Sequence, residues 1–124
     1  MRQKYELWDV VPGRTVRGAI EGVIDDWEGF RVLLRDQETE RVIRIAFNSH
    51  VAYQNRDETD LDGEAARSEG LGCGCFYRVW DSEFVARFKS DTARQFGELK
   101  HFAIITETDC IDVLATDEPT VDSL

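Results

Sequence analysis

The chain has 124 residues, of which 25 are acidic and 15 are Lys or Arg, so its formal net charge is -10 at pH 7. The length fits one domain, and a hydrophobic content of 42% supports one core, which argues against a disordered chain. The charge argues against binding to DNA, RNA or an anionic membrane, because phosphate contacts need Lys and Arg. No apolar run approaches the roughly 20 residues that a membrane-spanning helix needs.

Cysteine usage and the N-terminus indicate a cytoplasmic protein. The three cysteines are an odd number, and no apolar run of a secretory signal precedes them, which is typical of reduced thiols. The strong excess of Arg over Lys is typical of proteins from GC-rich bacterial genomes.

The first elements expected along the chain are strands. Tyr5 and Leu7 begin a short alternating pattern. Residues 15–25 combine apolar side chains with Gly18 and Gly22, which weaken a helix and predict a bent or bulged strand.

A β-hairpin is expected after a turn at residues 26–29. Residues 30–35 and 42–47 carry apolar side chains at every second position, and the polar connection 36–40 joins them. With the strand at 15–25 they predict a three-stranded antiparallel meander with one apolar face. The other face carries three arginines: Arg31, Arg35 and Arg44.

The middle of the chain is expected to be irregular. Residues 48–53 are predicted to leave the sheet as a short turn of helix, and residues 54–75 show no periodicity. A segment this long without secondary structure is typical of a functional or mobile loop. The loop 54–75 contains six acidic side chains: Asp57, Glu58, Asp60, Asp62, Glu64 and Glu69.

Regular structure is expected again at residues 76–80, which predict a strand. Asp81 and Ser82 are both candidate N-caps for a helix that ends near residues 90–91. A weaker helical turn is expected at residues 92–96.

The C-terminal part predicts a second hairpin, from strands at 101–106 and 110–115, and then a frayed tail at 116–124. The expected fold is therefore a single α+β domain over residues 1–124. The antiparallel meander and the C-terminal hairpin form a curved sheet, with one or two helices packed on it.

Cys73 and Cys75 are the first candidates for a functional site. Zinc needs four well-placed N or S ligands, and its close cysteine pairs are usually separated by about two to four residues. Cys-x-Cys is tighter than that, and Cys110 with His50 or His101 would have to supply the other ligands. We therefore expect no metal and interpret the cysteines as small buried side chains.

A nucleophilic set is the second candidate. On paper it would combine Cys75 or Cys110 as the nucleophile, His101 as the base, and Asp109 or Asp112 to orient the base. No local signature supports this set, and Ser82 lacks the Gly-x-Ser-x-Gly context of a nucleophile elbow. His101 begins an apolar strand, so we expect it to bond a backbone carbonyl or a carboxylate.

Two further patterns do not match the sites that they suggest. Residues 60–64 are acidic like a calcium loop but lack the spacing and the flanking helices of an EF-hand. Residues 70–74 are glycine-rich but lack the Lys of a phosphate-binding loop. The sequence therefore indicates no cofactor. Its tryptophans are expected in the core or at an interface: Trp8, Trp27 and Trp80.

The negative charge is concentrated in two segments. Residues 54–75 carry a net charge of -4 and residues 103–124 one of -6, while the charges of the remaining chain cancel. A field concentrated in this way can steer a basic partner. Solubility and protection of strand edges are the alternative roles.

Three segments of the second half, residues 76–84, 100–104 and 110–114, are similar to small, acidic, uncharacterised bacterial proteins. Some of these lie beside polymorphic toxins and are regarded as immunity proteins. The resemblance extends loosely over residues 16–115. It implies an inhibitor that binds a toxin by surface complementarity and performs no chemistry.

Two functions remain open. The first is a non-catalytic cytoplasmic binding protein, an immunity protein that neutralises a basic toxin or effector through its acidic surface. The second is a small enzyme or ligand-binding domain with a site under the loop, which uses His101, a cysteine and an arginine such as Arg44. The absence of a credible catalytic set favours the binding protein. Its expected partner-binding residues are Tyr53, Asp57, Glu58, Asp60, Asp62 and Glu64.

Overall fold

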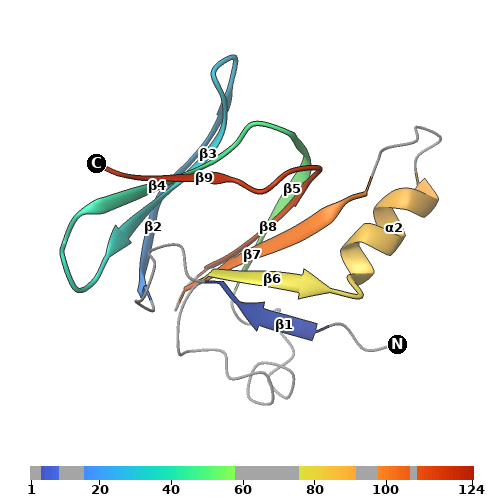
Figure 1. Cartoon of the computed structure of the whole chain (residues 1–124), viewed down its shortest axis with the longest axis horizontal. Coiled ribbons are helices and arrows are strands. Elements are labelled where there is room, and N and C mark those ends of the chain that lie inside the picture. The colour runs from blue at the N-terminus through green and yellow to red at the C-terminus, as the bar shows by residue number, and fades with distance from the viewer. Residues whose placement is uncertain (1–3, 9–15, 58–75, 92–97, 107–108) are drawn as a thin grey trace.

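The computed structural model describes residues 4–8, 16–57, 76–91, 98–106 and 109–124. These parts of the chain form two antiparallel β-sheets and the helix α2 (Glu83–Asp91) (Figure 1). The five-stranded sheet has the order β1 (Lys4–Leu7), β6 (Phe76–Trp80), β7 (Lys100–Ile105), β8 (Asp109–Ala115) and β5 (His50–Asp57). The four-stranded sheet has the order β2 (Gly18–Asp26), β3 (Gly29–Asp36), β4 (Val42–Phe47) and β9 (Thr120–Ser123).

The predicted meander is confirmed by β2, β3 and β4, which pair in sequence order. The apolar side chains of β3 face those of β4 in the pairs Phe30–Phe47, Val32–Ile45 and Leu34–Ile43. The predicted bulge occurs between Ile20 and Gly22, where the register of β2 with β3 shifts. Gly18 is required nearby, because a Cβ at this position would clash with the backbone carbonyl oxygen of Arg35.

The chain leaves the meander after β4 as predicted, but the short turn of helix predicted over residues 48–53 is wrong. A two-residue turn leads from β4 into β5, and β5 pairs with β8 as far as Asp57. Residues 54–57 therefore belong to a strand and not to the predicted loop. The sequence pattern hides β5 because it is an edge strand that carries polar side chains such as Gln54 and Asn55. Its backbone partner β8 lies far away in the sequence.

The predicted frayed tail at 116–124 is also wrong. Residues 120–123 form β9, which pairs with β4, and Val121 packs against the core. With four residues, β9 is too short to show a periodic pattern of its own. Its pairing with β4 satisfies its backbone groups, which local sequence reasoning does not detect.

A bent two-stranded ribbon connects the two sheets. The chain passes from β4 into β5 on one side of the ribbon and from β8 towards β9 on the other (Figure 1). At the bend, the N–H of Thr116 bonds the carbonyl oxygen of Ser49 at 3.3 Å, and the N–H of Asp117 bonds Ser49 Oγ at 2.9 Å. Strands that cross from one sheet to another in this way are how packed sheets turn their corners.

The main core lies between the two sheets and takes residues from both. Its buried members are Val16, Phe30, Val32, Leu34, Ile43, Ile45, Phe47, Phe76, Phe102, Ile104, Ile111, Val113 and Ala115. Alternation along β7 and β8 directs the remaining side chains of these strands to the opposite face of the five-stranded sheet. That face is buried too, in a second cluster of Tyr5, Tyr77, Val79, Ala103, Ile105 and Cys110.

The described strands and helix agree with an α+β fold in which antiparallel strands predominate. The single curved sheet is not confirmed, because the strands divide between two sheets. The predicted helix is confirmed as α2. The helical turn predicted at 92–96 and residues 58–75 of the predicted loop lie outside the described residues.

Candidate functional site

Four polar side chains form a continuous hydrogen-bond chain on the second face of the five-stranded sheet. Ser82 Oγ lies 2.6 Å from His101 Nδ1, and His101 Nε2 lies 2.7 Å from Asp112 Oδ1. The amide of Gln54 donates to Asp112 Oδ2 at 3.1 Å. His101 and Asp112 are almost completely buried, whereas Ser82 is only half-buried. The chain therefore leads from the interior towards the surface at Ser82.

Strand register brings these residues together. Gln54 on β5 lies directly opposite Asp112 on β8. Asp112 is also opposite Ala103 on β7, so His101, two residues earlier on β7, is its diagonal neighbour on the same face. Ser82 follows β6 and precedes α2, which places it beside the start of β7.

Ser82 is also the N-cap of α2, as its position after a strand predicted. Its Oγ accepts a hydrogen bond from the N–H of Val85 at 3.1 Å, and its carbonyl oxygen accepts one from the N–H of Ala86 at 3.2 Å. The cap fixes the serine side chain at the positive end of the helix.

The hydrogen bonds assign the proton of the imidazole. An ionised carboxylate can only accept hydrogen bonds, so the proton shared with Asp112 is carried by His101 Nε2. His101 Nδ1 is then an acceptor, and the hydroxyl of Ser82 donates to it. With Val85 donating to Ser82 Oγ, each of the four hydrogen bonds described here joins one donor to one acceptor. This is the arrangement in which an imidazole polarises a hydroxyl group.

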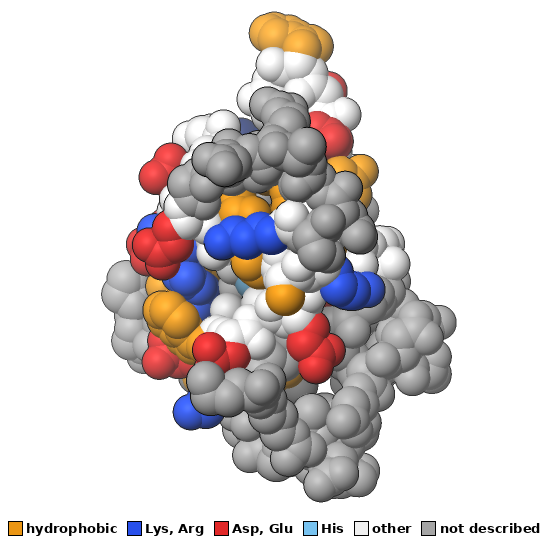
Figure 2. Space-filling view, turned by 90° about the vertical axis from the view of Figure 1, so that its right-hand side faces the viewer, with side chains coloured by type: hydrophobic (Ala, Val, Ile, Leu, Met, Phe, Trp, Pro, Cys, Tyr) orange, Lys and Arg blue, Asp and Glu red, His pale blue; other side chains and the backbone are white. Residues whose placement is uncertain are grey.

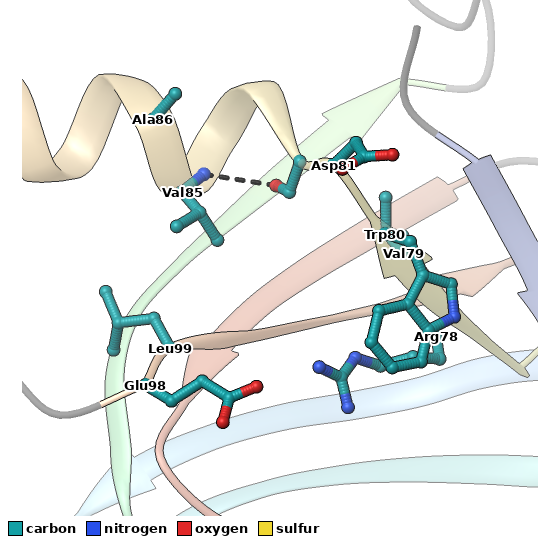
Figure 3. Close-up of a pocket in the computed structure, with 9 residues that line it drawn as sticks. Arg78, Val79, Trp80, Asp81, Val85, Ala86, Glu98 and Leu99 are labelled. Atoms are coloured by element: carbon teal, nitrogen blue, oxygen red, sulfur yellow. Dashed lines mark hydrogen bonds between the residues drawn. The ribbon is translucent and has the colours of Figure 1, made fainter. Parts of the chain in front are cut away.

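Ser82 borders a hollow of about 440 Å³ at the end of β6 (Figure 3). The strand β6, the first turns of α2 and the residues before β7 supply its walls. The residues that line it are Arg78, Val79, Trp80, Asp81, Ser82, Val85, Ala86, Glu98 and Leu99. Its walls combine aliphatic and aromatic surface with a hydroxyl, a guanidinium and two carboxylates, which is the usual make-up of a small-molecule site.

Arg78 is held in the hollow by aromatic rings. Its guanidinium carbon lies 4.2 Å from the ring centre of Trp80 and 5.4 Å from that of Phe102. Its Nε is buried and has no hydrogen-bond partner in the part of the chain that the structure describes. Burial lowers the pKa of the Arg78 guanidinium, and the nearby charge of Glu98 opposes that shift. Arginine still remains a cation at neutral pH, so a partly buried positive charge lines the hollow.

The structure brings together only part of the predicted nucleophilic set. His101 and Asp112 are in contact, and the expected bond from His101 to a carboxylate is confirmed. Cys110 is buried among the apolar residues of the second cluster, as expected for a small hydrophobic side chain. Cys75 and the side chain of Asp109 lie outside the described residues.

Sequence reasoning missed Ser82 as the third member. Local motifs do not reveal it, because the chain depends on the pairing of β7 with β8 and not on a strand-to-helix elbow. The available signal was an N-cap serine directly after a strand, next to another strand that begins with a histidine.

The predicted partner-binding residues are described only in part. Tyr53 lies on β5, is 41% exposed, and its ring centre is 4.4 Å from that of Phe30. Asp57 ends β5. The other predicted residues lie outside the described part of the chain: Glu58, Asp60, Asp62 and Glu64.

A second acidic and aromatic surface lies beside Tyr53 and was not predicted. Trp27, at the β2–β3 turn, is 91% exposed and is flanked by acids. His50 stacks on Phe30 and lies 3.6 Å from Asp25, measured from Nε2 to Oδ1. We call this region the hairpin-tip surface, and its members are Asp25, Asp26, Trp27, Glu28, His50 and Tyr53.

The two views agree on where this surface lies. Figure 1 places the β2–β3 turn at the far end of the molecule. Figure 2 shows hydrophobic surface at that same end, with acidic side chains next to it. The surface therefore projects away from the hollow and from α2.

The arginines on the outer face of the meander are engaged with acids. Arg31 NH1 lies 3.0 Å from Asp26 Oδ1, and Arg44 NH2 lies 3.1 Å from Asp122 Oδ2. Arg35 pairs with Glu21. Arg44, which the second hypothesis named as an example of a ligand-binding arginine, is thus paired with Asp122 and is not among the residues that line the hollow. The arginine that lines a hollow is Arg78.

Comparison with family models, curated proteins and solved structures gives no match to this chain. Among the described residues, no helix has the length and apolar character to cross a membrane. Within the same residues, no group of three or more His, Cys, Asp or Glu side chains is arranged to hold a metal ion.

Proposed function

We propose that this protein binds a basic protein partner through the hairpin-tip surface, and that it acts in the cytoplasm as an immunity protein that neutralises a toxin. The observation that supports this proposal most directly is Trp27, which is 91% exposed between acidic neighbours. Tryptophan is among the side chains most often found as anchors of protein interfaces, because a partner that covers it removes a large apolar area from water.

The acids around Trp27 suit a basic partner. Asp25, Asp26 and Glu28 surround the tryptophan in the sequence, and all three are exposed. Charge of one sign accelerates association with a partner of the opposite sign, whereas a buried aromatic anchor supplies most of the affinity. The hairpin-tip surface offers both.

The tip is preorganised by hydrogen bonds. Asp26 Oδ1 accepts from the N–H of Glu28 at 2.9 Å and from Arg31 NH1 at 3.0 Å. Gly29, with a φ of 119°, closes the turn in a conformation that other residues rarely adopt. A rigid turn loses little conformational entropy on binding, which raises the affinity of its anchor.

Tyr53 extends the same surface along β5. Its ring packs on Phe30, which is buried and therefore fixes its position. The remaining acids of the proposed interface follow Tyr53 in the sequence: Asp57, Glu58, Asp60, Asp62 and Glu64. Tyr53 thus links the hairpin tip to the acidic segment of the sequence.

The proposal is tested by co-expression with the product of the adjacent gene, followed by growth rescue and co-purification. Trp27→Ala is expected to weaken binding by about 30-fold or more, the loss typical of a central aromatic anchor. Asp25→Lys combined with Glu28→Lys is expected to slow association by about tenfold or more and to reduce its dependence on salt.

The turn at the other end of β3 provides the matched control. Glu38→Lys combined with Glu40→Lys makes the same change in net charge at the β3–β4 turn, and should leave affinity and salt dependence close to wild type. If the two double variants weaken binding equally, only the total charge matters and the hairpin-tip surface is not the interface. Unchanged binding by Trp27→Ala contradicts the proposed anchor.

A further inference from the structure

The hydrogen-bond chain and the hollow meet at one residue, Ser82. Behind it, His101 and Asp112 are buried and in line, with contacts of 2.6 and 2.7 Å. In front of it lies a hollow of about 440 Å³ that Ser82 helps to line. A purely structural cap needs neither a buried imidazole at its oxygen nor an open space beside it.

We propose that Ser82 is the nucleophile of an esterase site, in which His101 is the general base and Asp112 is a positioning residue. The substrate class is a small carboxylic ester that carries an anionic group, which Arg78 receives. This activity is independent of the hairpin-tip surface, which lies at another end of the molecule.

The reaction uses water as its second substrate. Ser82 Oγ attacks the carbonyl carbon of the ester, and its proton passes to His101 Nδ1. The bond to the alcohol breaks, and the departing alcohol takes the proton from His101. Water then attacks the acyl carbon and gives one proton to His101, and Ser82 Oγ leaves and recovers that proton. The products are a carboxylic acid and an alcohol.

The surroundings of Ser82 suit this chemistry. Asp112 accepts a hydrogen bond from His101 Nε2–H, which leaves Nδ1 unprotonated and able to receive the serine proton. The carboxylate also stabilises the imidazolium that forms. Gln54 holds the second oxygen of Asp112. The positive end of α2 adjoins Ser82, and it favours the negative charge that develops on the carbonyl oxygen.

Arg78 determines which esters are preferred. Its guanidinium lies against Trp80 and lines the same hollow as Ser82. A carboxylate of a substrate would pair with this cation through charge-assisted hydrogen bonds. Glu98 lines the same hollow and repels such an anion. The preference is therefore expected to fall in Arg78→Gln and to rise in Glu98→Gln.

The first experiment is labelling of the full chain with a fluorophosphonate probe, read by mass spectrometry. Ser82 Oγ attacks the phosphorus and displaces fluoride, and its proton passes to His101. The site assigned here predicts a single adduct on Ser82. The Ser82→Asn variant keeps an N-cap side chain but has no hydroxyl, so it should fold and remain unlabelled.

The second experiment compares hydrolysis of 4-nitrophenyl acetate with that of 4-nitrophenyl succinate, which carries a free carboxylate. Wild type should prefer the succinate. Ser82→Asn should lower both rates by about 100-fold or more, and Asp112→Asn should lower kcat by about 100-fold with little change in KM. Arg78→Gln should raise KM for the succinate by about tenfold, and should affect hydrolysis of the acetate far less than that of the succinate.

Ser49 provides the matched control serine. Its Oγ also accepts a backbone N–H, from Asp117 at 2.9 Å, but among the described residues it has no hydrogen bond to a histidine. Ser49→Ala should retain wild-type labelling and hydrolysis. The proposal is overturned if wild type shows no adduct on Ser82, or if folded Ser82→Asn hydrolyses both esters as fast as wild type. Neither result bears on partner binding, so the two proposals fail separately.

Discussion

The four-stranded sheet has one face in the core and one face in water, whereas the central strands of the five-stranded sheet are buried on both faces. On the outer face of β3 and β4, Arg31 and Arg44 are paired with exposed acids. On the second face of β7 and β8, His101 and Asp112 are paired with each other away from water. Both sheets pair their charged side chains, but on the five-stranded sheet no water can take the place of a partner that is removed.

The difference teaches which polar contacts the fold depends on. An exposed ion pair gives little stability, because water and salt compete with it and long side chains lose freedom. A buried pair gains little over an apolar core, yet the removal of one partner strands the other in a medium that cannot solvate it. Polar residues of the five-stranded sheet should therefore tolerate substitution far less well than those of the four-stranded sheet.

The largest effect is expected from Asp112→Ala. This change leaves two donors, His101 Nε2 and the amide of Gln54, without their acceptor, and should lower the free energy of unfolding by about 3 kcal/mol, since each buried unsatisfied donor costs about 1–3 kcal/mol. Asp122→Ala breaks the exposed pair with Arg44 and should cost less than about 1 kcal/mol. Urea unfolding followed by circular dichroism measures both values. Equal losses in the two variants would remove the distinction between the sheets.

The same contrast explains which parts of the fold the sequence predicted. The meander was predictable because its outer face meets water, so apolar and polar residues alternate along β3 and β4. The strands β7 and β8 were found as short apolar runs, and nothing in those runs indicates that both faces are covered. The strands β5 and β9 were missed because their pairing partners are distant in the sequence.

Only part of the candidate site, the partner of His101, could be predicted from the sequence. The start of an apolar strand at His101 indicated a satisfied histidine, and a carboxylate was one of the two expected partners. The third member, Ser82, depends on how β6 ends beside β7. The exposure of Trp27 depends on how far the β2–β3 turn projects from the rest of the molecule, which the sequence of the turn does not determine. Both features depend on the tertiary structure and not on local sequence patterns.

An intermediate effect is expected at the two glycines of β2. In Gly18→Ala the added methyl group clashes with the backbone carbonyl oxygen of Arg35, so the paired strands must separate, at a cost of about 1–3 kcal/mol. In Gly22→Ala the nearest atom to the added methyl group is Leu33 Cδ1 at 3.9 Å, which is an ordinary contact. That variant should stay within about 0.5 kcal/mol of wild type.

Thermal and urea unfolding of the two glycine variants test this pair. Both glycines lie on β2 of the four-stranded sheet, so the comparison measures the steric cost of an added methyl group. It does not involve the loss of a buried hydrogen bond, which is the effect tested at Asp112. A Gly18→Ala protein as stable as Gly22→Ala would show that β2 yields without loss, and that the close approach of β2 to β3 is not required.

The smallest effect is expected where Arg31 meets Asp26 on the outer face. The hydrogen bond from Arg31 is the main cause that holds the pKa of Asp26 below its ordinary value of 3.8, and the N–H of Glu28 adds to it. A carboxyl whose folded pKa is depressed stabilises the protein above its unfolded pKa, and that stability is lost as the pH falls through the folded pKa. In Arg31→Gln the pKa of Asp26 should rise towards the ordinary value, and stability at neutral pH should hardly change because water solvates both groups. Carboxyl titration by NMR measures the pKa. Arg41→Gln is the control, since the Arg41 side chain is exposed and is not among the groups that shift the pKa of Asp26. If the pKa of Asp26 stays depressed in Arg31→Gln, the N–H of Glu28 in the turn causes the shift. The ion pair with Arg31 would then make no contribution to the pKa of Asp26.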